Sequence, residues 1–153
     1  MPIVSPEFRE TLSKVEGAGN LSLCYQCSAC VAECPAAQQC AGFNPREIVL
    51  ASALGVADYL TDKGSVIWQC TTCYKCYERC PQGTHPVEVI TALKNIAFDS
   101  GNAPEEVEAL RRTVGEQATI IVSSDAIERR RSELGLEPAP RVAPTSEMSK
   151  LLE

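Results

Sequence analysis

Cysteines are the residues of this sequence that are best suited to chemistry. Nine cysteines occur in 153 residues, and eight of them form two runs, CYQCSACVAECP at residues 24–35 and CTTCYKCYERCP at residues 70–81. Each run has the spacing C-x-x-C-x-x-C-x-x-x-C and closes on a proline. Every cysteine of the first run recurs 46 positions later, so the two runs form an internal repeat.

The spacing within each run is typical of chains that bind [4Fe–4S] clusters. A C-x-x-C-x-x-C loop is tight enough to point three thiolates at three irons of one cubane and to aim backbone N–H groups at its sulfurs. The fourth cysteine lies one helical turn beyond the third and points elsewhere, so in two-cluster proteins it ligates the other cluster. The repeat therefore predicts two crossed sites: Cys24, Cys27, Cys30 and Cys80 for cluster 1, and Cys70, Cys73, Cys76 and Cys34 for cluster 2.

The prolines that follow the two crossing ligands fit this arrangement. Pro35 and Pro81 lack an N–H and restrict the residue before them, so we expect the chain to turn away after Cys34 and Cys80. A zinc site built from two C-x-x-C pairs is the main alternative. It would leave the third and fourth cysteine of each run without a role. A thioredoxin-like C-x-x-C needs a βαβ context, which the sequence does not predict.

Other residues near the runs have simpler interpretations. Cys40 lies outside the motif and is expected to be a buried thiol near cluster 1. Trp68 is expected in the core. His85, the only histidine, is expected to be a loop residue rather than a ligand, because the motif cysteines already fill both clusters. The tyrosines within the runs are expected to shield the clusters by packing; they are Tyr25, Tyr74 and Tyr77.

The composition argues against nucleic acid and membrane partners. The net charge is −6, whereas phosphate binding needs clustered Lys and Arg, and the basic run at 129–131 is expected on a solvated helix face. The longest apolar run, IVLASALGVA at 48–57, is half of the ~20 residues that a membrane-spanning helix needs. No signal-peptide pattern is visible at the start. We therefore expect a cytoplasmic protein, in which thiols stay reduced and clustered cysteines bind metal.

Helices are expected to position the cysteine runs. Apolar spacing and capping residues predict helices over residues 6–16, 44–62 and 87–98, with Gly55 dividing the second into two. Two more helices are expected at 103–117 and 123–135, and TIIV at 119–122 is the only β-like run. We therefore expect an all-α fold that comprises an N-terminal arm (1–20), a cluster-binding domain (21–101), C-terminal helices (102–135) and a proline-rich docking or disordered tail (136–153).

The segments around both motifs resemble the two-cluster iron–sulfur subunit of heterodisulfide reductase. The resemblance rests on NPREIV after the first motif, IWQCTTCYKCYERCPQ across the second, PVEVITALKNIA beyond it and SSDAIERRRSELGL further on, and it covers roughly residues 20–137. It implies an α-helical ferredoxin fold with two [4Fe–4S] clusters. It also implies that the eight motif cysteines are the cluster ligands.

The resemblance further implies a role in a hetero-oligomeric oxidoreductase. In that family, the two-cluster subunit relays single electrons from a flavin-containing iron–sulfur subunit to the catalytic subunit, which reduces the mixed disulfide of coenzyme M and coenzyme B in methanogenesis. The catalytic subunit uses adjacent cysteines, and this sequence has no Cys-Cys pair, so no catalytic residue is expected on it. The alternatives are a subunit of a bacterial-type complex that acts on other disulfides or sulfur compounds, and a free dicluster ferredoxin.

Overall fold

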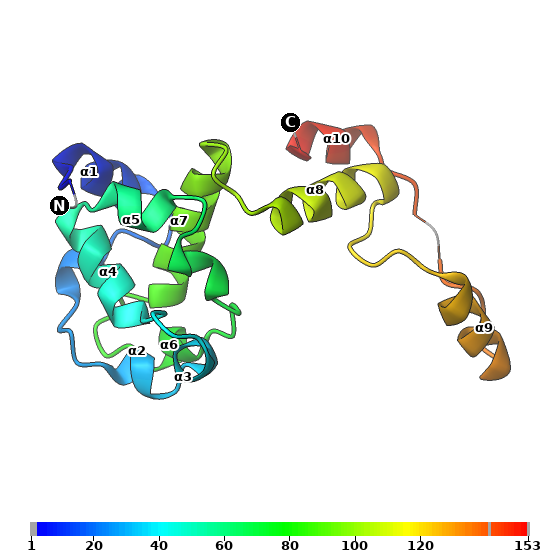
Figure 1. The fold of residues 1–153 in the computed structure, drawn as a ribbon, viewed down its shortest axis with the longest axis horizontal. Coiled ribbons are helices and arrows are strands. Elements are labelled where there is room, and N and C mark those ends of the chain that lie inside the picture. The colour runs from blue at the N-terminus through cyan, green and yellow to red at the C-terminus, as the bar shows by residue number, and fades with distance from the viewer. Residues whose placement is uncertain (1–2, 141, 153) are drawn as a thin grey trace. The chain divides into compact units, whose positions relative to one another are not determined.

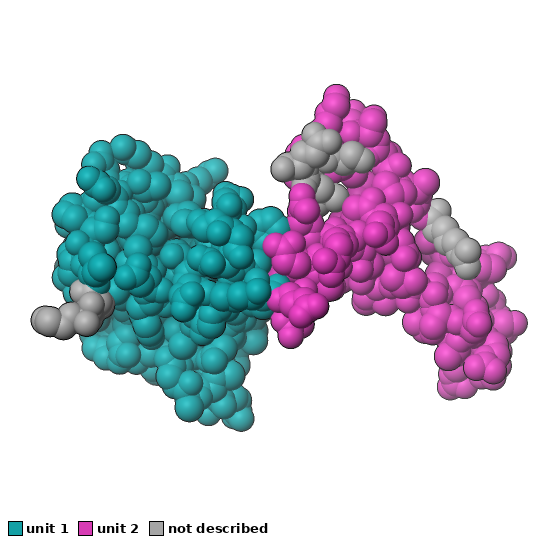
Figure 2. All heavy atoms as spheres, turned by 45° about the horizontal axis from the view of Figure 1, so that its top comes forward, with its two compact units in different colours: residues 1–104 teal, residues 105–153 magenta. Residues whose placement is uncertain are grey.

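The computed structural model describes residues 3–140 and 142–152 of the chain. It divides into two compact units, residues 1–104 and residues 105–153 (Figure 2), which are described separately below. The described residues form helices and no strand; a single antiparallel bridge joins Val4 and Val56. The expected all-α fold is therefore confirmed, and the β-like run at 119–122 forms no strand.

Short helices surround two longer ones in the first unit (Figure 1). The elements in chain order are α1 (Pro6–Lys14), the 3-10 turn η1 (Leu21–Leu23), α2 (Ala29–Ala32), α3 (Pro35–Gln39), α4 (Pro45–Leu54), α5 (Ala57–Thr61), the 3-10 turn η2 (Val66–Gln69), α6 (Lys75–Glu78) and α7 (Pro86–Asp99). Helices α4 and α7 pack against each other, and most of the buried apolar side chains lie between them and α1, η1, α5 and η2.

Local sequence signals set the bounds of α4 and α5. Asn44 caps α4 by accepting hydrogen bonds from the N–H groups of Arg46 and Glu47, and Pro45 occupies the first helical position. Gly55 ends the helix in the left-handed region at φ +75°, so the predicted division of residues 44–62 into two helices is confirmed. A Cβ on Gly55 would lie 2.2 Å from the carbonyl oxygen of Ser5, so glycine is needed there for space as well.

The internal repeat of the sequence is also a repeat of backbone structure. Each cysteine run is preceded by a 3-10 turn, η1 or η2, and its third cysteine lies in a four-residue helix, α2 or α6. The two short helices pack against each other. Both runs are thereby brought to the same region of the unit, next to the amino-terminal ends of α4 and α7.

The second unit contains three helices, α8 (Glu105–Gln117), α9 (Asp125–Glu133) and α10 (Ser146–Leu152). Helices α8 and α9 bury no described side chain, and many large apolar residues of this unit are exposed. The proline-rich segment after α9 is tied to it by Arg131 Nε, which donates to the Glu137 carbonyl at 2.8 Å. Helix α10 lies within the segment for which the sequence predicts a tail. Within the described part of the chain, no helix is long and apolar enough to cross a membrane.

Candidate iron–sulfur centre

Four cysteines line one hollow in the first unit. They are Cys24, Cys27 and Cys30 from the first run and Cys80 from the second. The hollow encloses about 370 Å³ of empty space, its mouth included, and the starts of α4 and α7 contribute Arg46, Val49 and Pro86 to its wall. This is the set of cysteines that the spacing predicts for cluster 1.

The other four motif cysteines line a second hollow. They are Cys70, Cys73 and Cys76 from the second run and Cys34 from the first. This hollow encloses about 310 Å³, and Phe43, Pro45, Val87 and Ile90 complete its largely apolar wall. Each hollow thus combines three cysteines of one run with the fourth cysteine of the other, which is the donor set that two cubanes require.

The cysteine loops share an unusual backbone conformation. Gln26 and Ser28 have φ values of +57° and +66°, and the equivalent Thr72 and Tyr74 have values of +53° and +59°. Few residues other than glycine adopt this left-handed region, and for the β-branched Thr72 it is a clear outlier. Ser28 and Tyr74 lead directly into the right-handed helices α2 and α6. A left-handed residue next to a right-handed one turns backbone N–H groups to one side, which forms a concave anion site of the kind found around Fe–S clusters. The strain at four non-glycine positions is thus accounted for by a cluster in each loop.

Two hydrogen bonds already point at cysteine sulfurs of the first hollow. The Thr84 N–H donates to Cys80 Sγ at 3.3 Å, and Gln26 Nε2 donates to Cys24 Sγ at 3.2 Å. Donors to sulfur stabilise the added negative charge of a reduced cluster. Residues between and after the motifs therefore take part in the site together with the cysteines.

Burial and mutual proximity set the pKa values of the innermost thiols. Burial raises the pKa of Cys30 to about 11, and the neighbouring Cys24, Cys27 and Cys80 add to the rise. Burial likewise raises the pKa of Cys76 to about 12, with further contributions from Cys70, Cys30 and Cys34. These thiols are neutral without metal at pH 7, so iron must displace their protons when it binds.

Cys80 behaves in the opposite way. Burial raises its pKa, but hydrogen bonds from the backbone at His85, Gln82 and Thr84, together with one from the Thr84 side chain, outweigh burial and lower the pKa below the usual value. These donors lie between Pro81 and the start of α7. The chain that follows Cys80 therefore folds back, and its backbone N–H groups point at Cys80 Sγ. Pro35 does not begin such a turn after Cys34. It is the first residue of α3, which starts directly after the extended Cys34.

The outer cysteines are open to solvent, whereas the third cysteines of the runs face inward. Cys27 and Cys73, at equivalent positions, are exposed, while Cys76 is buried and Cys30 is half-buried. Cys30 and Cys76 lie in α2 and α6, which pack against each other, and Cys30 is among the groups that raise the pKa of Cys76, so the two sites are neighbours. Among the described residues, no group of three or more His, Cys, Asp or Glu side chains converges as the ligands of a single metal ion do. A cubane instead takes its four thiolates at separate corners.

Two of the remaining residues that the sequence singled out line the hollows, and the others lie outside them. Tyr25 lines the first hollow with 71% of its surface exposed, and Tyr74 lines the second. Tyr77 instead packs edge-on against His85, with ring centroids 3.7 Å apart. Cys40 packs on the core at the end of α3 and is not among the described residues that line the two hollows. Trp68 also packs on the core, beneath Lys94 Nζ.

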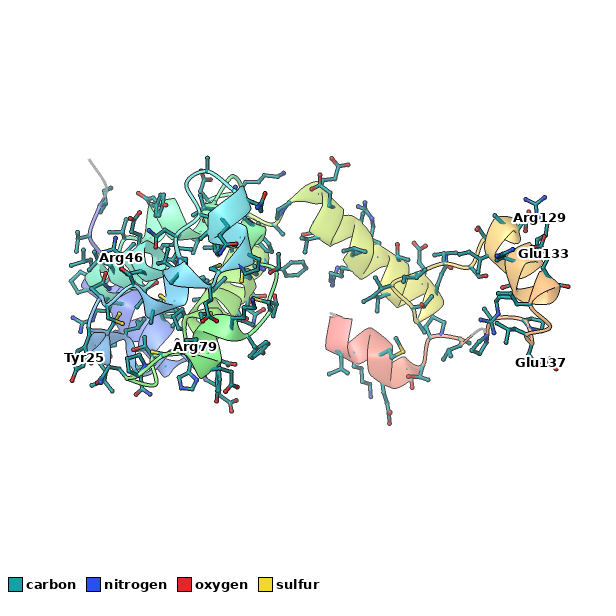
Figure 3. All side chains as sticks on the ribbon, turned by 90° about the horizontal axis from the view of Figure 1, so that it is seen from below. Tyr25, Arg46, Arg79, Arg129, Glu133 and Glu137 are labelled. Carbon is teal, nitrogen blue, oxygen red and sulfur yellow. The ribbon has the colours of Figure 1, made fainter. Side chains whose placement is uncertain are left out.

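Three polar residues of the first hollow were missed in the sequence. Gln26, Arg46 and Thr84 all line it, and each has a buried polar atom without a hydrogen-bond partner. Figure 3 labels Arg46 at the start of α4. Arg46 lies in NPREIV, which marks the start of a helix and contributes to the family resemblance, and neither Arg46 nor Thr84 was expected in the site.

A family model for a 4Fe-4S dicluster domain matches residues 20–84. The match covers both cysteine runs, the helices between them and the turn that ends at Thr84. Together with the nine cysteines and the two hollows, it shows that the chain carries two [4Fe–4S] clusters.

Relatives match most of the chain. The iron–sulfur subunit of the CoB–CoM heterodisulfide reductase of Methanopyrus kandleri is 31% identical over 90% of this chain and 74% of its own length. The corresponding subunit of the ferredoxin:CoB–CoM heterodisulfide reductase of Methanosarcina mazei is 32% identical over 86% and 81%, respectively. An iron–sulfur subunit of the CoB–CoM heterodisulfide reductase of Methanocaldococcus jannaschii is 34% identical over 86% and 67%. The chain therefore belongs to the family of two-cluster iron–sulfur subunits of heterodisulfide reductase, which are electron-transfer subunits of an oxidoreductase.

Proposed function

We propose that this chain relays single electrons through its two clusters, from a flavin-containing subunit to the catalytic subunit that reduces the coenzyme M–coenzyme B heterodisulfide. The names of the relatives support this assignment, because they describe subunits of enzymes that act on the CoB–CoM heterodisulfide. Each bound cluster supplies a one-electron centre. The chain itself holds the clusters, orients them and insulates them, and we assign it no catalytic residue.

The proposed ligands follow the two hollows. Cys24, Cys27, Cys30 and Cys80 hold cluster 1, and Cys70, Cys73, Cys76 and Cys34 hold cluster 2. The sequence spacing and the lining of the hollows support the same crossed assignment independently. Because each run contributes to both sites, neither cluster can be lost without disturbing the loop of the other.

One observation supports the proposed relay most directly. The inward cysteines Cys30 and Cys76 adjoin each other, while the outward cysteines Cys27 and Cys73 are exposed. This arrangement supports a relay, because each site would have one edge open to a partner and another edge beside the second site. Two partner surfaces, one at each exposed edge, are what a relay between two subunits needs.

Electron flow in the purified complex tests this function. Cys80→Ala should remove a ligand of cluster 1 and stop the reduction of the heterodisulfide with electrons supplied through the flavin subunit. Cys40→Ala is the matched control, since Cys40 is a cysteine outside the motif and should leave the rate unchanged. Unchanged heterodisulfide reduction in Cys80→Ala would refute the relay.

A free dicluster ferredoxin is a second candidate, favoured by the net charge of −6. A diffusible carrier, however, has no use for a second unit with exposed apolar residues such as Ile120, Ile121 and Leu151. Size-exclusion chromatography of native lysate separates the two candidates. Elution as a small species favours the carrier, and elution with other subunits favours the relay.

A further inference from the structure

The first hollow contains buried polar atoms that make no well-formed hydrogen bond within the protein. They are Gln26 Oε1, Arg46 Nε and Thr84 Oγ1, although the Thr84 hydroxyl interacts with Cys80 Sγ closely enough to lower the pKa of that thiol. One other such atom occurs among the described residues, Trp68 Nε1, and Trp68 is not among the residues that line either hollow. Buried polar groups are nearly always hydrogen-bonded, so the gathering of these atoms at one hollow points to a partner that occupies it.

Two of the three groups can donate. Arg46 Nε carries an N–H, while Nη2 of the same guanidinium pairs with Glu47 Oε1 at 3.2 Å, and the Thr84 hydroxyl can donate its proton. Thr84 is 1% exposed, and the N–H of the same residue already points at Cys80 Sγ. The acceptors missing from this hollow are therefore the sulfur atoms of cluster 1.

The second hollow has no buried equivalent of these side-chain donors among the described residues. Phe43, Pro45, Val87 and Ile90 form the apolar part of its wall. Its polar side chains other than the cysteines are Thr71, Tyr74 and Lys75, and all three are exposed, so solvent competes for their donors and screens the charge of Lys75. The two cysteine loops repeat each other in backbone, but the side chains supplied by α4 and by the turn before α7 do not. The two sites therefore differ in the side chains that come from segments outside the cysteine motifs.

We propose that Arg46 and Thr84 donate hydrogen bonds to sulfurs of cluster 1 and hold its reduction potential above that of cluster 2. Reduction adds one negative charge to a cluster, and nearby donors and positive charge stabilise that charge. An electron that reaches cluster 2 from a reductant, which is the flavin subunit in the proposed complex, then passes to cluster 1. Cluster 2 is oxidised and cluster 1 reduced, and no bond forms or breaks. The inference rests on the ligand assignment proposed above.

Gln26 offers a competing explanation for Arg46. Its Oε1 is the unpartnered acceptor of the same hollow, and its Nε2 lies 3.5 Å from the Arg46 carbonyl. In this explanation, Arg46 Nε donates to Gln26 Oε1 instead of to the cluster. The two explanations differ in one consequence: only a donor to the cluster changes the potential of the cluster strongly.

A redox titration monitored by electron paramagnetic resonance tests the proposal on the full chain with reconstituted clusters. Wild type should show two reduction waves. Arg46→Met and Thr84→Val keep the bulk but lose the donors, and each should move the upper wave to lower potential while the lower wave stays in place. Thr84→Ser keeps the hydroxyl and should restore the upper wave. Lys75→Met, at the second hollow, should leave the upper wave unchanged.

The results that would overturn the proposal are as specific as the expected ones. An unmoved upper wave in both Arg46→Met and Thr84→Val, or movement of the lower wave instead, overturns the tuning. So does failure of both variants to bind about eight irons per chain, because the two residues would then serve assembly. Cys27→Ser and Cys80→Ser separate this inference from the assignment beneath it. If they abolish different waves, the ligand assignment fails; if both abolish the lower wave, the proposed order of potentials fails.

Discussion

Glu33 and Arg79 occupy equivalent positions of the two cysteine runs, 46 residues apart, and their side chains form an ion pair with Oε1 2.9 Å from Nη2. Each residue directly precedes a crossing cysteine, Cys34 or Cys80. The pair therefore joins the two runs at the point where each lends its fourth cysteine to the other site. Figure 3 labels Arg79, which follows α6.

This ion pair should nevertheless contribute little to stability. The side chains of Arg79 and Glu33 are 61% and 44% exposed, and exposed pairs contribute about 0–1 kcal/mol. We expect Glu33→Gln and Arg79→Gln each to lower the free energy of unfolding by less than about 1 kcal/mol, with no loss of iron. Thermal melting followed by cluster absorbance measures this. Loss of iron in either variant would show that the pair positions the crossing ligands.

The crossed arrangement predicts which cysteine substitutions abolish the same reduction wave. Cys34→Ser should abolish the same reduction wave as Cys73→Ser, although the two residues lie in different runs. Cys27→Ser, in the same run as Cys34, should abolish the other wave. Each variant should retain roughly four of the eight irons that two cubanes hold. If the affected waves followed the runs instead of the hollows, the crossing would be wrong.

The left-handed loop positions predict an order of tolerance at Ser28. With φ at +66°, Ser28→Gly should bind iron at least as firmly as wild type, Ser28→Ala should resemble wild type and Ser28→Val should weaken binding most. A left-handed conformation costs an ordinary residue about 1–2 kcal/mol, and branching at Cβ adds to this. The rate of cluster loss in the presence of a chelator measures the order. Equal rates in all three variants would mean that the loop relaxes freely.

The junction between α1 and α4 predicts a difference between two glycines. Gly42 and Gly55 both have positive φ, but a Cβ at Gly42 meets nothing within 4 Å, whereas one at Gly55 lies 2.2 Å from Ser5 O. Gly42→Ala should therefore cost about 1–2 kcal/mol through backbone strain alone, and Gly55→Ala a further ~1–3 kcal/mol through overpacking. Denaturant midpoints of the two variants provide the comparison, and similar midpoints would contradict it.

Much of the fold could be predicted because its signals are local. Asn44, Pro45 and Gly55 mark the bounds of α4 by capping and backbone preference, and the structure confirms these bounds. The expected helix at 87–98 is found as α7, Pro86–Asp99, with proline at its first position. Both helices have apolar faces whose periodicity can be read in the sequence.

The environment of the clusters could not be predicted in the same way. Arg46 reaches the first hollow only because tertiary packing places the start of α4 beside the first cysteine loop. Thr84 reaches it because the turn after Pro81 folds back on Cys80. The left-handed conformations of Gln26 and Thr72 leave no sign in residue type, since neither is a residue that prefers this region. Spacing thus predicted which cysteines line each hollow, and packing determined what surrounds them.

The division of the chain predicts that cluster binding and complex formation can be separated. The first unit contains all eight motif cysteines and the buried core, whereas α8 and α9 bury no described side chain. A chain that ends at Pro104 should therefore bind about eight irons and show both reduction waves, but should no longer copurify with partner subunits. Iron analysis and affinity purification measure the two properties. If the shortened chain bound only about half of the iron, the second unit would have to support one of the clusters.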